Sequence, residues 1–219
     1  MSSQLIEHVV LFNVTDNTDP SKANAMVDGL NGLSSLDVVL YLTAGPIHRL
    51  RSTSLKFTHM LHSRYRTVDD LSIYINHPDH LSVVRENVLP ICDDFMALDW
   101  IIQDLDGAAA PLPGSAMRVQ FVKLKEELED KEKGKVLEVI GELKEKSEEI
   151  RRISVGENFS PARAKGFSIG SIEFFPGLNE LDSAAEKGEL GKEKEKVRDY
   201  SDGVVVVDYV VPAAQSAIV

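Results

Sequence analysis

The chain has 219 residues, of which 43% are hydrophobic and 27% charged, a composition typical of one or two globular domains. Its formal net charge of −11 argues against nucleic acid as a partner, because phosphate binding needs a basic surface, and weakly against anionic membranes. No run approaches the roughly 18 apolar residues that a membrane span requires. The single cysteine, Cys92, and an N-terminus without a secretory pattern predict a soluble, cytoplasmic protein of a reducing compartment, with an organellar location left open.

The first predicted element is a strand over residues 8–14, HVVLFNV. Side chains alternate between the two faces of a strand, so Val10 and Phe12 point one way while Val9 and Leu11 point the other. Both sets are apolar. We therefore expect one face of this strand to pack on helices and the other to pack on a second sheet.

A helix is predicted to begin at Asp19-Pro20, because Asp is a good N-cap and Pro suits the first helical position. Thr67, followed three residues later by Asp70, resembles a capping box and predicts the start of a second helix. The apolar stripe of the first helix consists of Ala23, Met26, Val27, Leu30 and Leu33.

Two further strands are predicted between these helices, over residues 38–45 and 57–65. Alternation along the second of them, FTHMLHSRY, places His59 on one face with Leu61 and places His62 on the other. Because the neighbours of His59 are apolar or aromatic, we expect His59, in preference to His62, to point inward.

The segment His77-Pro78-Asp79-His80 is predicted to begin another helix, since proline suits the first position and an aspartate in the first turn complements the helix dipole. His77 would stand near the N-cap. His80 would lie one turn in, where the dipole disfavours imidazolium and predicts a neutral ring. A helix start with incidental histidines is the simpler interpretation. A metal site is less favoured, because zinc needs three or four ligands, and we expect neither a metal nor a cofactor.

The order of elements repeats in the second half at an offset of about 110 residues. Residues 105–116, rich in Ala, Pro and Gly, are predicted to link a first unit at 1–104 to a second at 117–213. Asp208-Tyr209 near the end of the second unit corresponds to Asp99-Trp100 in the first. The predicted fold class is α+β, with two tandem ferredoxin-like (βαββαβ) units whose antiparallel sheets pack as a pseudo-dimeric α/β barrel.

The histidines are distributed unequally between the two units. All six lie in the first, at His8, His48, His59, His62, His77 and His80. In the second unit the segment corresponding to INHPDH is SAAEKGELGK, with Glu186 and Glu189 near the histidine positions. We therefore expect one pocket in the first unit and a degenerate site in the second, although a satisfied core histidine is the alternative for each ring taken alone.

The segments EHVVLFNV, FTHMLHSRYRTVDDLSIYINHPDHLSVV and ALDWII closely resemble the stress-response A/B barrel domain, also called the dimeric α/β barrel. VGENFSPARAKGFSIGSIEFF resembles the plant tandem-domain members of that family. In the family, two ferredoxin-like units form a β-barrel with helices outside, either as a homodimer or within one chain. The resemblance implies a pseudo-dimer within this chain, and leaves a further homodimer open.

The family also includes the polyketide cyclase olivetolic acid cyclase. Resemblance to that enzyme implies that His8, Tyr74 and His80 line a cavity, with Tyr74 and His80 as the acid–base pair of an intramolecular aldol closure. His59 and His77 are further candidate ligand-binding residues.

Three functions follow from these observations. The leading hypothesis is a stress-response protein, non-catalytic or cryptically active, with one small apolar pocket for a hydrophobic or polyketide-like ligand. The second is a polyketide-cyclase-like lyase, although Gly29 stands where the cyclase has a further cavity tyrosine. The third is a purely structural or assembly protein.

Overall fold

The expected order of elements occurs twice in the computed structural model, which describes residues 3–52, 55–104, 110–186 and 195–212. The first unit contains β1 (Ser3–Val14), α1 (Pro20–Gly32), η1 (Leu33–Ser35), β2 (Tyr41–Pro46), β3 (Arg49–Arg51), β4 (His59–Tyr65), α2 (Val68–Asn76), α3 (Pro78–Val83), η2 (Val84–Val88) and β5 (Cys92–Asp104). The second unit contains β6 (Ala116–Leu124), α4 (Asp130–Gly141), η3 (Glu142–Lys146), β7 (Arg152–Glu157), η4 (Pro161–Arg163), β8 (Ile169–Phe175), α5 (Leu178–Glu186) and β9 (Ser201–Val210). Part of the expected linker, residues 105–109, lies outside the described residues.

The helices of the first unit begin where the capping residues predicted. The Asp19 side chain accepts a hydrogen bond from the Ser21 backbone N–H at 2.8 Å, with Pro20 in the first turn of α1. Thr67 Oγ1 accepts from the Asp70 N–H at 3.0 Å at the start of α2. Each cap satisfies a backbone donor that the helix itself leaves without a partner, which fixes where the helix starts.

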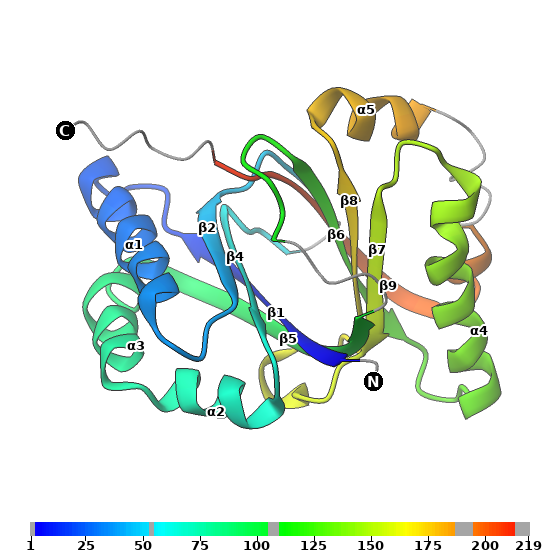
Figure 1. Ribbon diagram of the computed structural model, residues 1–219, viewed down its shortest axis with the longest axis horizontal. Helices are drawn as coiled ribbons and strands as arrows, with labels where there is room; N and C mark the ends of the chain where they lie inside the picture. The colour runs from blue at the N-terminus through cyan, green and yellow to red at the C-terminus, as the bar shows by residue number, and fades with distance from the viewer. Residues whose placement is uncertain (1–2, 53–54, 105–109, 187–194, 213–219) are drawn as a thin grey trace.

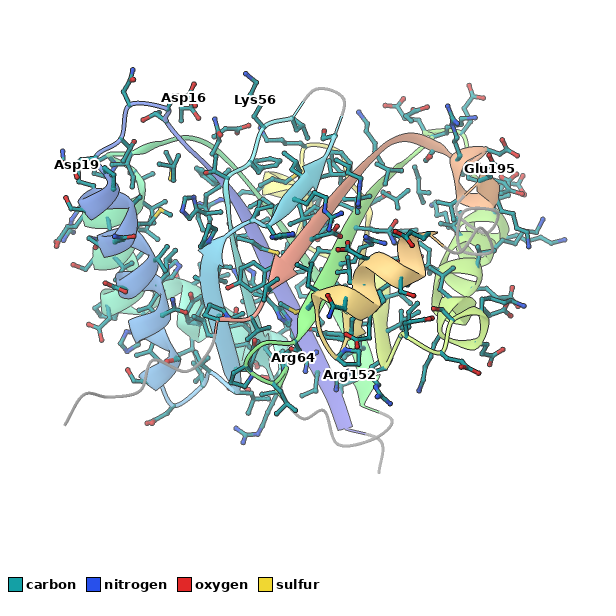
Figure 2. The ribbon with its side chains drawn as sticks, turned by 90° about the horizontal axis from the view of Figure 1, so that it is seen from above. Asp16, Asp19, Lys56, Arg64, Arg152 and Glu195 are labelled. Atoms are coloured by element: carbon teal, nitrogen blue, oxygen red, sulfur yellow. The ribbon has the colours of Figure 1, made fainter. Side chains whose placement is uncertain are left out.

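The strands form two antiparallel sheets, with the orders β2-β4-β1-β5 and β3-β9-β6-β8-β7 among the described residues. The sheets face each other and the helices lie outside them (Figure 1). Seen from above, α1 and α3 lie on one flank and α4 and α5 on the opposite one, with the strands between (Figure 2). This is the predicted barrel made of two ferredoxin-like units.

Both faces of β1 are buried, as its two apolar faces required. Val9 and Leu11 point into the space between the sheets and share one core with Phe121 of β6. Val10 and Phe12 point outward and pack in a second core with the helices of the first unit. A third core under α4 and α5 completes the second unit.

The two units exchange edge segments, which the sequence did not predict. β3 leaves the first unit and pairs with β9 of the second, with Arg49 opposite Asp208. In return, Asn158 after β7 forms an isolated bridge with Trp100 of β5, and the Phe159 N–H donates to the Asp99 carbonyl at 2.9 Å. Each sheet therefore continues into backbone from the other unit.

An aromatic side chain at each end of the barrel seals this exchange. Trp100 is fully buried, and its indole N–H donates to Ser154 Oγ at 2.9 Å. The indole ring lies against Gly156 and Gly170, which are opposite each other on β7 and β8. On the other side Tyr209 corresponds to Trp100: its hydroxyl lies 3.0 Å from Thr43 Oγ1, and the ring contacts Gly45 of β2.

We predict that Gly170→Ala destabilises the protein by about 1–3 kcal/mol, the typical cost of overpacking a core. A Cβ at position 170 would lie 2.5 Å from atoms of the Trp100 ring, which has no room to move. Gly134→Ala is the matched control. Gly134 lies inside α4 with open space around it, so the same change there should stabilise by about 0.5–1 kcal/mol. Urea unfolding of the two variants measures both changes in stability. Equal unfolding midpoints for the two variants would contradict the packing of Trp100 on β8.

Candidate functional site

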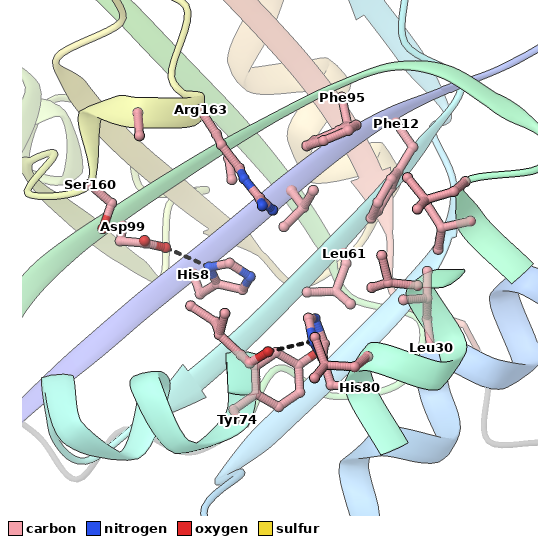
Figure 3. A pocket seen from close by; sticks show the side chains of 18 residues that line it. His8, Phe12, Leu30, Leu61, Tyr74, His80, Phe95, Asp99, Ser160 and Arg163 are labelled. Carbon is pink, nitrogen blue, oxygen red and sulfur yellow. Dashed lines mark hydrogen bonds and ion pairs between the residues drawn. The ribbon is translucent and has the colours of Figure 1, made fainter. Parts of the chain in front are cut away.

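A cavity of about 370 Å³ lies between the outer face of the first sheet and the segment from α2 to η2. Its walls are mostly apolar and come from β1, α1, β4, η2 and β5. The main apolar wall residues are Val10, Phe12, Leu30, Leu61, Val88 and Phe95. Figure 3 shows His8, Asp99, Tyr74, His80 and Arg163 among them.

His8 and Asp99 form a pair on the floor of this cavity. His8 points to the same face of β1 as Val10 and Phe12, and Asp99 lies directly opposite it on β5. Both side chains are buried, and His8 Nδ1 lies 2.5 Å from Asp99 Oδ1. Although burial raises the pKa of Asp99, the charge of His8 and hydrogen bonds with His8 and Ser160 hold it below its ordinary value. Asp99 is thus a carboxylate that accepts a hydrogen bond from Nδ1–H of His8.

The histidines of the HPDH segment have separate roles. His77 is the N-cap of α3: its Nδ1 accepts a hydrogen bond from the Asp79 N–H at 3.2 Å, so it marks a helix start. His80 lies in the first turn and faces the cavity. Its Nδ1 lies 2.9 Å from the carbonyl oxygen of Ile75, an acceptor, so Nδ1 carries the proton and Nε2 keeps its lone pair.

Burial lowers the pKa of His80; the hydrogen bond with the Ile75 carbonyl raises it by less, and the nearby charges of His8, Arg163 and His77 lower it further. The direction agrees with the neutral ring that the sequence predicted. The cause differs: we expected the helix dipole to disfavour the charged ring, whereas burial of the ring is the largest effect in the structure.

Tyr74 is the third polar group of the cavity and comes from α2. It is buried against His80, with ring centroids 4.7 Å apart, and against Tyr65, with centroids 5.2 Å apart. Burial raises the pKa of its phenol, so the hydroxyl stays protonated and can donate a hydrogen bond at neutral pH. The structure therefore brings His8, Tyr74 and His80 together.

His59 and His77 are not brought to this cavity. His59 is half-buried at the first residue of β4, where its Nδ1 bonds Thr58 Oγ1 at 2.8 Å. His77 is held at the helix cap described above. The expectation that His59 points inward in preference to His62 is wrong. His62 is fully buried in the barrel interior, because the carboxylate of Glu7 beside it supplies a partner that alternation alone could not reveal.

Glu7 and His62 belong to a buried network inside the barrel. His62 Nε2 lies 2.5 Å from a Glu7 carboxylate oxygen, and Arg64 donates to both oxygens at 2.9 and 2.8 Å. Burial raises the pKa of Glu7, but the charges of Arg64 and His62 outweigh it and hold that pKa well below its ordinary value. Arg64 and Arg152, labelled in Figure 2, both stack on Phe174 and tie this network to the second unit.

Three polar residues of the cavity were not predicted from the sequence. Asp99 was noted only as a marker of the repeat, although its place opposite His8 on the closing strand was a usable signal. Ser160 and Arg163 come from the second unit, through the loop around η4. No pattern in the sequence indicates that this loop reaches the first unit.

The second unit has the same strand pairing but different chemistry at the corresponding place. Arg118 takes the position of His8, opposite Asp208, and its Nε donates to Asp208 Oδ1 at 2.7 Å. Arg49 and Arg51 of β3 reach the same carboxylate at 3.2 and 3.1 Å. Ala184 stands in the place of Tyr74; the position of His80 falls at 190, which, like Glu189, lies outside the described residues.

Two further observations bear on the expected chemistry. Within the described ranges, no group of three or more His, Cys, Asp and Glu side chains could hold a metal ion. At Gly29, a Cβ would lie 3.3 Å from the Val83 side chain and 3.4 Å from that of Asn87. A tyrosine there would displace the wall formed by α3 and η2, so this chain builds its cavity without one.

Asp208→Asn is expected to destabilise the protein by about 3–5 kcal/mol, because it leaves the buried Arg118 without its counter-ion. Asp182→Asn is the control: it removes an exposed carboxylate that pairs with Arg49 at 2.5 Å. Chemical denaturation should show a large loss for the first variant and a midpoint near that of the wild type for the second. Similar midpoints for the two variants would show that Asp208 does not hold the units together.

Comparison with known proteins adds the family context. A family model described as Stress responsive A/B Barrel Domain matches residues 6–102 and again residues 117–211. The chain is 50% identical to a stress-response A/B barrel domain-containing protein of Arabidopsis thaliana, over 98% of this chain and 82% of that protein. It is 46% identical to a second stress-response A/B barrel domain-containing protein of the same species, over 97% of this chain and 99% of that protein.

Solved structures of the same overall shape are distant in sequence. One is a protein of Fusobacterium nucleatum whose proposed role is that of a monooxygenase, with a TM-score of 0.66 and 14% identity over 96% of this chain and 93% of that one. Another is an anthrone oxidase-like protein, with a TM-score of 0.65 and 9% identity over 96% of this chain and 93% of that one. These similarities show the fold. Within the described part of the chain, no helix is long and apolar enough to span a membrane.

Proposed function

Since this chain belongs to the stress-responsive A/B barrel domain family, we propose that it is a stress-response protein whose first unit binds one small, largely apolar ligand, while its second unit is structural. The observation that supports the proposal is the cavity that contains His8 and His80. In it a histidine–aspartate pair, a second histidine and a buried phenol converge within apolar walls. Its volume of about 370 Å³ suits a small molecule, and the combination of apolar walls with a few polar groups is typical of ligand pockets.

The second unit also has a cavity, of about 490 Å³, but Arg118 and Asp208 are not among its lining residues, so the two units differ in the polar groups that they offer a ligand. Arg118 donates a hydrogen bond to Asp208, and Arg49 of β3 pairs with the same carboxylate, so these charges satisfy one another. They also join β3 of the first unit to β9 of the second. That is a structural contact. The equivalent His8–Asp99 pair instead faces a cavity, and a buried His–Asp pair beside a cavity is a common functional arrangement.

Thermal unfolding with a panel of aromatic and medium-chain acids and their thioesters tests the ligand role. At a free ligand concentration 100 times Kd, binding stabilises the folded state by about 2.7 kcal/mol, which raises the Tm by about 5–10 °C for a chain of this size. We expect this shift in the wild type and a clear loss of it in His80→Ala.

The matched control for that experiment is His59→Ala, which removes a histidine of the same unit that lies outside the cavity. It should keep the full ligand-dependent shift. If no compound raises the Tm of the wild type, the pocket proposal fails and the family's barrel serves here as a structural or assembly protein.

A second candidate function, acid–base catalysis of the polyketide-cyclase kind, is favoured by one specific observation. With Nδ1–H donating to the Ile75 carbonyl, neutral His80 offers Nε2 as a base, and the adjacent Tyr74 hydroxyl is a donor. Nε2 would take a proton from the carbon α to a carbonyl of the substrate. That carbon would then attack a second carbonyl carbon of the same molecule, forming the ring bond.

The new alkoxide oxygen would accept a hydrogen bond from Tyr74 and then receive the proton back from His80, so that no co-reactant is consumed. His8 complements this role. The Asp99 carboxylate accepts a hydrogen bond from Nδ1–H of His8 and so fixes the orientation of that ring in the same cavity as His80.

For turnover of a linear poly-β-ketothioester, His80→Ala and Tyr74→Phe are each expected to lower kcat by about 10²- to 10⁴-fold with little change in Tm. Because the pKa of His80 is lowered by burial, its neutral form persists below pH 6.5. The acid limb of kcat/KM should therefore have a midpoint below about 6.5, and His80→Asn should abolish that limb. An acid limb above 6.5, or full activity in both variants, excludes His80 as the base.

A further inference from the structure

The loop around η4 carries a charged residue from the second unit into the cavity of the first, and the loop is firmly anchored there. Asn158 Oδ1 accepts from the backbone N–H groups of Asp99 at 3.0 Å and Ser160 at 3.1 Å. Lys165 pairs with Asp94 of β5 at 2.7 Å. Ala164, next to η4, is fully buried in the core shared by the two sheets. The position of Arg163 is therefore set by contacts on both sides of it.

Arg163 places its guanidinium over the ring of Phe95, with 5.4 Å between the guanidinium carbon and the ring centroid. Figure 3 shows it extending from the loop toward the cavity, between Phe95 and the His8–Asp99 pair. Stacking on an aromatic face holds the planar group while leaving its N–H donors available to a further partner.

No carboxylate among the described residues forms an ion pair with Arg163, an exposed residue that lines the cavity, whereas the buried Arg64 and Arg118 each have a carboxylate partner. Arg64 binds Glu7, and Arg118 binds Asp208. Asp99, the carboxylate that lines the cavity, is already bound to His8. Arg163 is thus the cation of this cavity that lacks a counter-ion within the described chain, although the whole chain carries a formal net charge of −11.

We propose that Arg163 binds the carboxylate of the ligand, so that the cavity selects small carboxylic acids with an apolar body. This inference rests on the proposed ligand-binding function. The body would lie against the walls formed by Leu30, Leu61 and Val88, with the carboxylate at the Arg163 end.

Charge favours a carboxylate over a phosphate monoester at this position. One guanidinium neutralises one carboxylate and can bind it through two parallel hydrogen bonds. A phosphate monoester carries about −1.5 to −2 at neutral pH, which would leave excess negative charge near Asp99.

Isothermal titration of the full-length protein with octanoate, octanamide and octyl phosphate tests the proposal. The three probes share an apolar body and differ in charge. Wild-type protein should bind octanoate about 10- to 100-fold more tightly than octanamide, the usual gain from charge-assisted hydrogen bonds. Arg163→Met, which keeps an apolar side chain over Phe95, should remove this preference while leaving octanamide affinity unchanged.

Two control variants complete the experiment. Arg163→Lys keeps the positive charge but lacks the planar guanidinium group, so it should retain part of the preference for octanoate. Arg66→Met removes an exposed arginine after β4 and should leave all three affinities as in the wild type. Because Arg163 is exposed, its variants should unfold at the wild-type midpoint.

The outcomes separate this inference from the function on which it rests. Equal, Arg163-independent binding of octanoate and octanamide overturns the role of Arg163 and leaves the apolar pocket intact. Tighter, Arg163-dependent binding of octyl phosphate overturns the assignment to carboxylates. If no probe binds the wild type, the pocket and the inference fail together.

Discussion

The contact on which the rest of the structure depends is the packing of Trp100 on the glycine pair Gly156–Gly170 of the other unit. Only glycine lets an indole ring approach two neighbouring strands this closely, and Ser154 satisfies the indole N–H in the dry interior. Because side chains alternate along β5, the strand that turns Trp100 into the barrel turns Asp99 out to the cavity. The interaction that joins the units therefore also fixes the carboxylate that orients His8.

The duplicated strand pair shows how one framework carries two kinds of chemistry. Each unit places a carboxylate at the same point of its closing strand, opposite a basic residue of its first strand. In the second unit the base is Arg118, which is always charged and forms a permanent ion pair. In the first it is His8, whose ring faces a cavity. The carboxylate is common to both units, and the partner decides whether the pair is an ion pair between the units or a histidine–aspartate pair that faces a cavity.

Much of the fold could be predicted because it depends on local patterns. The apolar alternation of β1 indicated two buried faces, and Asp19, Thr67 and His77 each begin a helix by a hydrogen bond within three residues. The misassigned His59 and His62 show the limit of that approach. Which face of β4 accepts a histidine depends on Glu7, which lies far away in the sequence. The exchange of β3 and the η4 loop between units is equally non-local, so Arg163 could not have been found from the sequence.

The cavity brings these local and distant contributions together at its two histidines. Both rings have Nδ1 held by an oxygen: the carboxylate of Asp99 for His8 and the carbonyl of Ile75 for His80. The Ile75 carbonyl fixes the tautomer of His80 and by itself raises the pKa of that ring, but burial lowers the pKa by more. Burial disfavours charge on His80, and the neighbouring His8 and Arg163 act in the same direction. The second unit supplies one of those charges, so the state of His80 in the first unit depends on the pairing of the two.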